Sequence, residues 1–312
     1  MHRRSLLVLA AATALSSVAP AFAQTNTTNQ GNPAMPAPTK SGYAPVNGIQ
    51  LYYEIYGEGK PLVLMHGGFT TIAMFTPILP ALAAGRQVIA VELQAHGRTG
   101  PLGRPMTFEN MATDVAELIR YLGHEKADVM GYSLGGNTAL RVAIDHPEVV
   151  DHLVVVSSVY AFSGWQEYNQ QGMKGMAADP VAAAAGMKQS PLYPMYAAVA
   201  KDPETNWPKA VAEMASLVGK DFDWSAEIPK ITAPTLLVVG DWDGVRISHA
   251  AHLFELLGGS KQDAMYDRSG MNQNRMAVLP NTTHYESGVS PALLPVVLPF
   301  LDGYPEAPRF AG

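Results

Sequence analysis

The sequence predicts an α/β domain in which helices cover both faces of a central, mostly parallel sheet. Short, continuous apolar runs recur along the chain, and such runs are typical of strands buried on both faces. Helix-like segments lie between them, and this alternation favours parallel strands with helical crossovers. One apolar run ends in the glycine-flanked turn 131–135, and a helix-like segment begins directly after it.

The elements follow in order from local composition. Asn47-Gly48 favours a tight hairpin turn, and the alternating, aromatic-rich segment after it predicts a strand over 49–56. The apolar runs predict further strands at 62–65, 88–93, 127–130, 153–156, 235–239 and 276–279. Helices are expected at 108–122, 137–145 and 248–257, with a last helix at 293–301 although Pro295 and Pro299 weaken it.

One stretch, residues 160–230, is too long for a single crossover helix and predicts an inserted helical cap. Most of its aromatic and methionine side chains are expected to form the cap's own core. Others would face a substrate cavity, where methionine adapts to varied shapes. The side chains concerned are Phe162, Trp165, Met173, Met176, Met187, Tyr193, Met195, Tyr196, Trp207, Met214 and Trp224.

The amino-terminal segment has the composition of a secretory signal peptide over residues 1–23. His2, Arg3 and Arg4 precede a short apolar run, and Ala21-Phe22-Ala23 forms a small-residue cleavage site. The alternative is a membrane anchor, but the apolar run is short for a span. Residues 24–41 are expected to be a disordered leader. The protein is therefore expected to be periplasmic or secreted.

The rest of the chain is expected to divide into a first part of the core at 42–159, the cap at 160–230 and a second part of the core at 231–312.

Composition excludes several classes of function. The chain has no cysteine, so disulfides and a lipid-modified cysteine are both excluded. Its net charge of −6, without a basic run, argues against nucleic-acid binding. No metal-binding spacing such as H-E-x-x-H is present, and no cofactor is expected.

The turn 131–135 is a G-x-S-x-G sequence with Ser133 at its centre. A sharp strand-to-helix turn exposes a serine hydroxyl, and glycines flank it because the turn has no room for side chains. The alternative role for Ser133 is a helix N-cap. The strand-like approach and helix-like exit favour a nucleophile, which would need a base beside it.

With these motifs in this order, residues 42–301 resemble the α/β-hydrolase fold, and within it bacterial carboxylesterase-like and lactonase-like serine hydrolases. The resemblance implies that the His66-Gly67-Gly68-Phe69 loop donates one oxyanion-hole N–H, from Gly68 or, if the loop is shifted by one, from Phe69. The second donor would be Leu134, directly after the nucleophile. His66 itself is expected to be structural.

The resemblance also implies an acid and a base after the nucleophile in the chain. The acid usually stands three residues after the glycine that ends a strand, which selects Asp243 and leaves Asp241 as the alternative. The base is a histidine just past the last strand, which selects His284. Its rivals His249 and His252 fall on a predicted helix and are expected at the surface.

Two further loops have recognisable sequences. Residues 92–99 resemble the family's D-x-P-G-H-G-x-S loop, with Glu92 for Asp, Gln94 for Pro, Ala95 for Gly and Thr99 for Ser, and we expect the loop to brace the oxyanion region. Residues 263–272 look like an extra loop on the His284 side.

These residues predict a serine hydrolase that cleaves a carboxylic ester or lactone through an acyl-enzyme. A perhydrolase, in which peroxide replaces water, and a carbon–carbon bond hydrolase would share the same three side chains. A haloalkane dehalogenase is disfavoured because that chemistry uses an aspartate nucleophile at the strand-to-helix turn, where this chain has Ser133. A non-catalytic ligand-binding protein of the same fold is the alternative from another class. The expected partner is a small ester or lactone.

Overall fold

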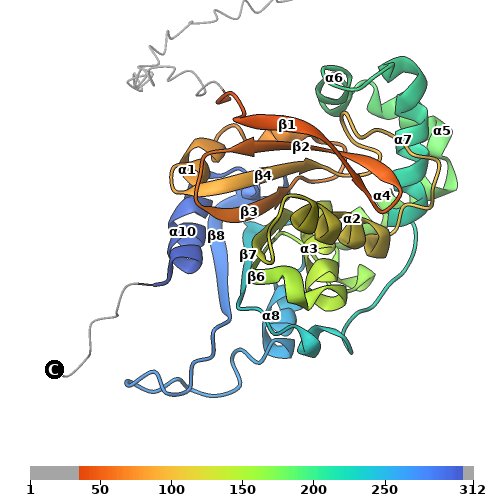
Figure 1. Ribbon diagram of the computed structural model, residues 1–312. Helices are drawn as coiled ribbons and strands as arrows, with labels where there is room; N and C mark the ends of the chain where they lie inside the picture. Colours follow the sequence, from red (N-terminus) through yellow and green to blue (C-terminus); the bar gives the residue numbers. More distant parts are fainter. Residues whose placement is uncertain (1–34, 305–312) are drawn as a thin grey trace, which may run out of the picture. The chain divides into compact units, whose positions relative to one another are not determined.

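The computed structural model describes residues 35–304, and within them one eight-stranded sheet runs through the molecule in the order β1-β2-β4-β3-β5-β6-β7-β8 (Figure 1). The expected signal peptide and most of the expected leader lie outside the described residues. From β4 to β8 neighbouring strands pair in parallel, whereas β1 and β2 form an antiparallel hairpin and β2 joins β4 antiparallel. The expected α/β-hydrolase fold, with its mostly parallel sheet, is confirmed. The strands are β1 (Lys40–Val46), β2 (Ile49–Tyr56), β3 (Lys60–Met65), β4 (Arg86–Glu92), β5 (Ala127–Tyr132), β6 (Val150–Val156), β7 (Thr235–Trp242) and β8 (Arg275–Thr283).

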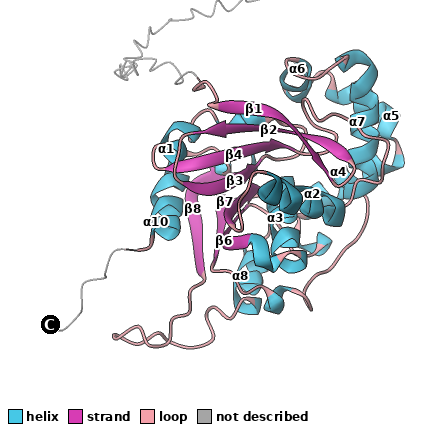
Figure 2. Ribbon diagram, in the orientation of Figure 1, coloured by secondary structure: helices cyan, strands magenta, loops and turns pink. Residues whose placement is uncertain are grey.

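Helices lie on both faces of this sheet (Figure 2). They are α1 (Leu79–Ala83), α2 (Phe108–Tyr121), α3 (Leu134–Asp145), α4 (Glu167–Ala178), α5 (Pro180–Met187), α6 (Leu192–Ala197), α7 (Pro203–Val218), α8 (Ile247–Leu256), α9 (His284–Ser287) and α10 (Leu294–Asp302). None of these helices is long and apolar enough to cross a membrane.

Strand alternation supplies a core on each face. In β3, Val63 and Met65 pack into the cluster under α2 and α3, whereas Leu62 and Leu64 pack into the cluster under α1 and α10. Because successive side chains of a strand point to opposite faces, an entirely apolar strand fits a sheet covered on both sides.

The first strand begins at Lys40, two residues before the expected boundary of the core. Lys40 pairs with Ile55 and the amide of Thr39 donates to the Ile55 carbonyl, so the end of the expected leader is part of the sheet. The hairpin turn is where the sequence places it, with both Asn47 and Gly48 at positive φ.

The segment 160–230 contains helices α4 to α7, between β6 and β7. A bridge between Ala161 and Asp223 joins its two ends. Trp207 is fully buried and its indole N–H donates to the Ala184 carbonyl at 2.9 Å, so this tryptophan belongs to the cap's own core.

Candidate active site

Ser133 stands on a strained turn between β5 and α3. Its backbone has φ 52° and ψ −115°, a conformation that costs a non-glycine residue about 1–3 kcal/mol. A Cβ at Gly131 would come within 2.0 Å of the Gly135 carbonyl oxygen, and one at Gly135 within 2.3 Å of the Met65 carbonyl oxygen. The turn can therefore close only with glycine at both flanks. Ser158 Oγ also donates to the Ser133 carbonyl at 2.6 Å, which helps to hold the turn.

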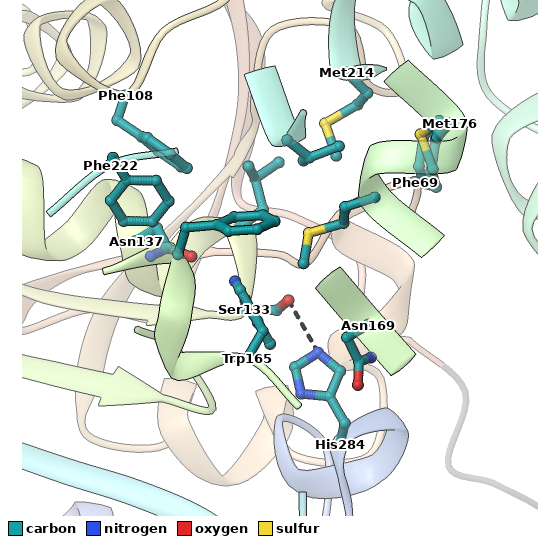
Figure 3. Close-up of a pocket in the computed structure, with 15 residues that line it drawn as sticks. Phe69, Phe108, Ser133, Asn137, Trp165, Asn169, Met176, Met214, Phe222 and His284 are labelled. Carbon is teal, nitrogen blue, oxygen red and sulfur yellow. Dashed lines mark hydrogen bonds between the residues drawn. The ribbon is translucent and has the colours of Figure 1, made fainter. Parts of the chain in front are cut away.

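The structure brings Ser133, His284 and Asp243 together, and Figure 3 shows the contact between Ser133 and His284. Ser133 Oγ lies 3.1 Å from His284 Nε2, and His284 Nδ1 lies 2.7 Å from Asp243 Oδ1. Asp243 follows β7 and His284 follows β8, so the ends of parallel strands deliver all three side chains at one edge of the sheet. With Nδ1–H donated to the carboxylate, Nε2 is left to accept the serine proton.

The Asp243 carboxylate is buried but well supplied with hydrogen-bond donors. Its Oδ1 also accepts the Val245 amide at 3.0 Å, and its Oδ2 accepts the Gly240 amide at 3.1 Å and the Ser157 hydroxyl. Burial by itself would raise the pKa of Asp243, but these donors and the His284 imidazole outweigh it and hold the pKa below its usual value. The carboxylate is therefore kept ionised beside the imidazole.

The carboxylate of Asp241, the alternative acid, binds backbone amides and not His284. Its two carboxylate oxygens each accept a backbone amide at 2.9 Å, from Asn281 and Thr282, and these donors lower its pKa. Asp241 thus ties the end of β7 to the end of β8 without contacting the imidazole.

The rival histidines also lie outside this cluster. His249 is buried, contrary to expectation, because its ring stacks on Tyr160 with 4.0 Å between centroids and Nε2 accepts the Tyr160 amide at 3.2 Å. That burial lowers the pKa of His249 to about 4. His252 is exposed as expected and contacts the Tyr160 hydroxyl at 2.6 Å.

Gly68 and Leu134 line the same pocket as Ser133. The N–H groups of Gly68 and Leu134 have no acceptor among the described residues, and Leu134 is the first residue of α3, where no carbonyl within the helix is available. The Phe69 amide, by contrast, donates to His96 Nε2 at 2.7 Å. Of the two expected positions, the structure therefore leaves Gly68 free.

The histidines of the two expected loops hold this region in place. His96 Nδ1 donates to the Gln94 carbonyl at 2.7 Å, while His66 Nε2 accepts the Leu93 amide at 3.2 Å. Complete burial lowers the pKa of His66 to about 3 and that of His96 to about 4, so both rings are neutral. His96 fixes the loop that carries Gly68 by accepting the neighbouring amide.

Sequence reasoning missed Ser157. It follows β6 at positive φ, is fully buried, and contacts the Ser287 hydroxyl at 2.6 Å in addition to Asp243. The only signal was its position, since it directly follows a buried strand, as Ser133 does on the neighbouring strand.

A pocket of about 170 Å³ opens above Ser133. Helix α3 contributes Leu134 and Asn137, the core contributes Phe108, and His284 lies at one side (Figure 3). Apart from Asn169, the cap side chains that line the pocket are aromatic or aliphatic: Phe162, Trp165, Met173, Met176, Met214, Val218 and Phe222. Some cap residues thus face the pocket, whereas Trp207 and Tyr196 do not line it.

Among the described residues, one group of acidic and histidine side chains is close enough to share a cation: Asp128, Asp151 and His152. Lys60 Nζ lies 2.9 Å from Asp128, and Arg86 contacts its other oxygen at 2.8 Å, so two cations already neutralise the group. We therefore assign no metal to it.

The loop 263–272 is not beside His284. It precedes β8, whereas His284 follows it, and a strand of this length separates the two by roughly 25 Å (Figure 1). The expectation was wrong because a parallel strand carries the chain from one edge of the sheet to the other.

Comparison with known proteins agrees with this architecture. Residues 60–201 match the family model described as the alpha/beta hydrolase fold. A soluble epoxide hydrolase from Corynebacterium sp. is 37% identical over 119 residues, which cover 37% of this chain and 41% of that protein. The chain thus spans about two fifths of the length of this curated relative.

Solved structures align over much more of the chain. The enol-lactonase from Burkholderia xenovorans has a TM-score of 0.65 and 21% identity, covering 83% of this chain and 99% of its own. A carboxylesterase from Bacillus subtilis has a TM-score of 0.63 and 21% identity, and the match covers 85% of this chain and 92% of the esterase. At this identity the likeness establishes the fold.

Proposed function

The chain has the α/β-hydrolase fold, and from that premise we propose that it is a serine hydrolase of carboxylic esters or lactones. The observation that carries the proposal is the relay from Ser133 Oγ through His284 to Asp243, with contacts of 3.1 and 2.7 Å. A serine hydroxyl next to an imidazole is suited to acyl transfer, and the oriented carboxylate favours the imidazolium that forms.

In the first half-reaction, Ser133 Oγ attacks the carbonyl carbon of the substrate and its proton passes to His284 Nε2. The carbonyl oxygen becomes negative and lies against the N–H groups of Gly68 and Leu134. Removing one such donor costs other enzymes about a hundred- to a thousandfold in rate. The intermediate then expels the alcohol, which takes the proton from His284, and the acyl group stays on Ser133.

In the second half-reaction, water gives a proton to His284 Nε2 and attacks the acyl carbon. Collapse of this intermediate releases the carboxylic acid and returns the proton to Ser133 Oγ. For a lactone, the alcohol and the acid are two ends of one product.

The pocket supports an apolar substrate, because its cap side is made almost wholly of aromatic and methionine side chains. Dehalogenation through an aspartate nucleophile is disfavoured, because the strand-to-helix turn of this chain carries Ser133 at that position. The relative from Burkholderia sp. that is named fluoroacetate dehalogenase therefore gives no reason to propose that reaction here.

The test is labelling by a fluorophosphonate probe combined with a hydrolysis screen over esters of graded acyl length and over lactones. We expect covalent labelling of one serine and turnover of at least one ester or lactone. A folded protein that is neither labelled nor active on any of them would be a ligand-binding member of the fold, and the proposal would fail.

We also propose that the protein is exported and cleaved after Ala23. The support is the sequence of residues 1–23, with its basic start, apolar run and small-residue site. Mass spectrometry of the exported protein should find Gln24 at the amino terminus. Exported protein that still begins at Met1 would contradict this.

A further inference from the structure

Asn137 is a polar side chain in an otherwise apolar part of the pocket. It is only 2% exposed and lies on α3 four residues after Ser133, so it occupies the same face of the helix one turn further on. Four residues of helix correspond to ~6 Å along the axis. Figure 3 shows Asn137 on the side of Phe108 and Phe222, away from His284.

The orientation of the Asn137 amide follows from its partner. Its Nδ2 donates to the carbonyl oxygen of Val159, just after β6. A carbonyl oxygen can only accept, so the nitrogen must face Val159 and Oδ1 must face the other way. Among the described residues no donor reaches Oδ1, and Figure 3 shows this oxygen turned toward the side of the pocket that Ser133 occupies.

Oδ1 is therefore an acceptor that opens to the pocket and has no donor from the described part of the protein, so a ligand can supply one. The side chains around this acceptor define the rest of that ligand. Phe108 and Phe222 are in edge-to-face contact, with 5.4 Å between ring centroids, and both line the pocket. Such a wall suits a flat aromatic group.

We propose that Asn137 determines specificity, by accepting a hydrogen bond from a hydroxyl or N–H group carried on an aromatic part of the substrate. This inference rests on the proposed function for the reaction itself and adds the substrate class. A site built to bind a donor discriminates strongly against an analogue that lacks it, because the buried acceptor is then left unpaired.

The kinetic test uses two 4-nitrophenyl esters of the same size, 4-hydroxyphenylacetate and 4-fluorophenylacetate. The wild-type protein should prefer the hydroxylated ester in kcat/KM by roughly tenfold or more. Asn137→Leu should bring this ratio close to one, mainly by slowing turnover of the hydroxylated ester. Thr138→Val is the matched control, since Thr138 is buried in the same helix, donates to the Leu134 carbonyl and does not line the pocket; it should keep the wild-type ratio.

A wild-type ratio at or below one would overturn the proposal. So would an Asn137→Leu variant that loses activity on both esters equally, since Asn137 would then only anchor Val159.

A binding measurement keeps the inference separate from catalysis and from the folding of the Asn137 variant. With Ser133→Ala, p-cresol should bind at least several-fold more tightly than 4-fluorotoluene, as followed by ligand-observed NMR. Equal affinities would mean that water satisfies Asn137, and the inference would fail. If p-cresol is preferred but the wild-type protein hydrolyses no ester, the proposed function fails and the binding preference stands.

Discussion

Ser157 Oγ donates a hydrogen bond to the Asp243 carboxylate oxygen that is not shared with His284 Nδ1. The two residues come from the ends of neighbouring strands, β6 and β7. Ser157 is held there at positive φ, with its amide donating to the Val238 carbonyl at 2.8 Å. The hydroxyl therefore fixes the acid through the oxygen that the imidazole leaves free.

We predict that Ser157→Ala lowers kcat/KM about ten- to a hundredfold, because a hydrogen bond to a charged group contributes roughly 1.5–3 kcal/mol. The readout specific to positioning is the pH–rate profile. Its acidic limb should move, because loss of the donor changes how strongly Asp243 stabilises the imidazolium. Thr282→Val removes another buried hydroxyl nearby, one that donates to the Pro280 carbonyl, and should leave the profile in place. An unchanged profile in Ser157→Ala would assign Ser157 a purely structural role.

Ser133→Ala is predicted to lower kcat by about 10⁶, as loss of the nucleophile does in subtilisin, and to abolish fluorophosphonate labelling. Thermal unfolding should be no less cooperative than in the wild-type protein, because the substitution removes only a hydroxyl. Labelling that persists in this variant would place the nucleophile elsewhere.

Substitutions of the two carboxylates at the end of β7, Asp243 and Asp241, should have different effects on turnover and stability. Asp243→Asn is expected to lower kcat by about 10⁴, since an amide facing Nδ1 favours the wrong tautomer of His284. Asp241→Asn should retain most of the turnover and instead lose stability, because its oxygens hold the amides of Asn281 and Thr282. Steady-state kinetics and thermal unfolding on both variants decide this, and the reverse ranking would assign the acid to Asp241.

Two cap methionines offer a matched pair for the substrate pocket. Both pack against the same core cluster, but only Met176 lines the pocket. Met176→Ala should change the preference between a bulky and a small ester by roughly 1–3 kcal/mol, the range for one lost apolar contact. Met187→Ala should lower stability without changing that preference. If neither variant alters the ratio of the two activities, the cap is a stability element only.

Stability is predicted to fall as the pH drops from 7.5 to 5.5. Burial lowers the pKa of His66 to about 3 and the pKa values of His96 and His249 to about 4, so the unfolded chain takes up protons below about pH 6.5 while the folded chain does not. Their stabilising contribution is complete above the pKa of an unfolded histidine and is lost as the pH falls. Burial also raises the pKa of Glu92 to about 7, which acts in the opposite direction over the same range.

Three histidines outweigh one carboxyl group, so acid should destabilise the fold on balance. Urea unfolding at the two pH values measures the difference. His249→Gln should reduce it, because glutamine can accept the Tyr160 amide without titrating. A midpoint that is equal or higher at pH 5.5 would contradict the prediction.

Much of the fold could be predicted because its signals are local. A continuous apolar run predicts a buried strand wherever it occurs, and Asn47-Gly48 favours one turn geometry regardless of what packs on it. The errors arose where the answer depended on packing. His249 lies on the helix that was expected, but the ring of Tyr160 covers it.

The residues of the candidate site also fall into those that local sequence could identify and those that depend on packing. Ser133 could be identified from its own turn, because Gly131 and Gly135 are required by steric contacts within a few residues and β3. The choice between Gly68 and Phe69 could not be made, since it depends on whether a distant His96 ring accepts one of the two amides. Asp243 and Asp241 are likewise only two residues apart, and the direction each carboxylate takes is set by donors from other strands.

The amino-acid sequence alone was sufficient to predict most of the strands, the longer helices of the core, the turn at Ser133, and the small set of side chains able to act with Ser133. Those properties depend on residue type and short spacing, which the chain carries wherever it lies. Three other features depend on the folded chain: the choice of Asp243 oxygen that contacts His284, the hydrogen bond from Ser157, and the acceptor that Asn137 leaves in the pocket. Hydrogen bonds between strand ends depend on distances of a few tenths of an ångström, and these distances exist only once the sheet has brought residues far apart in the chain into contact.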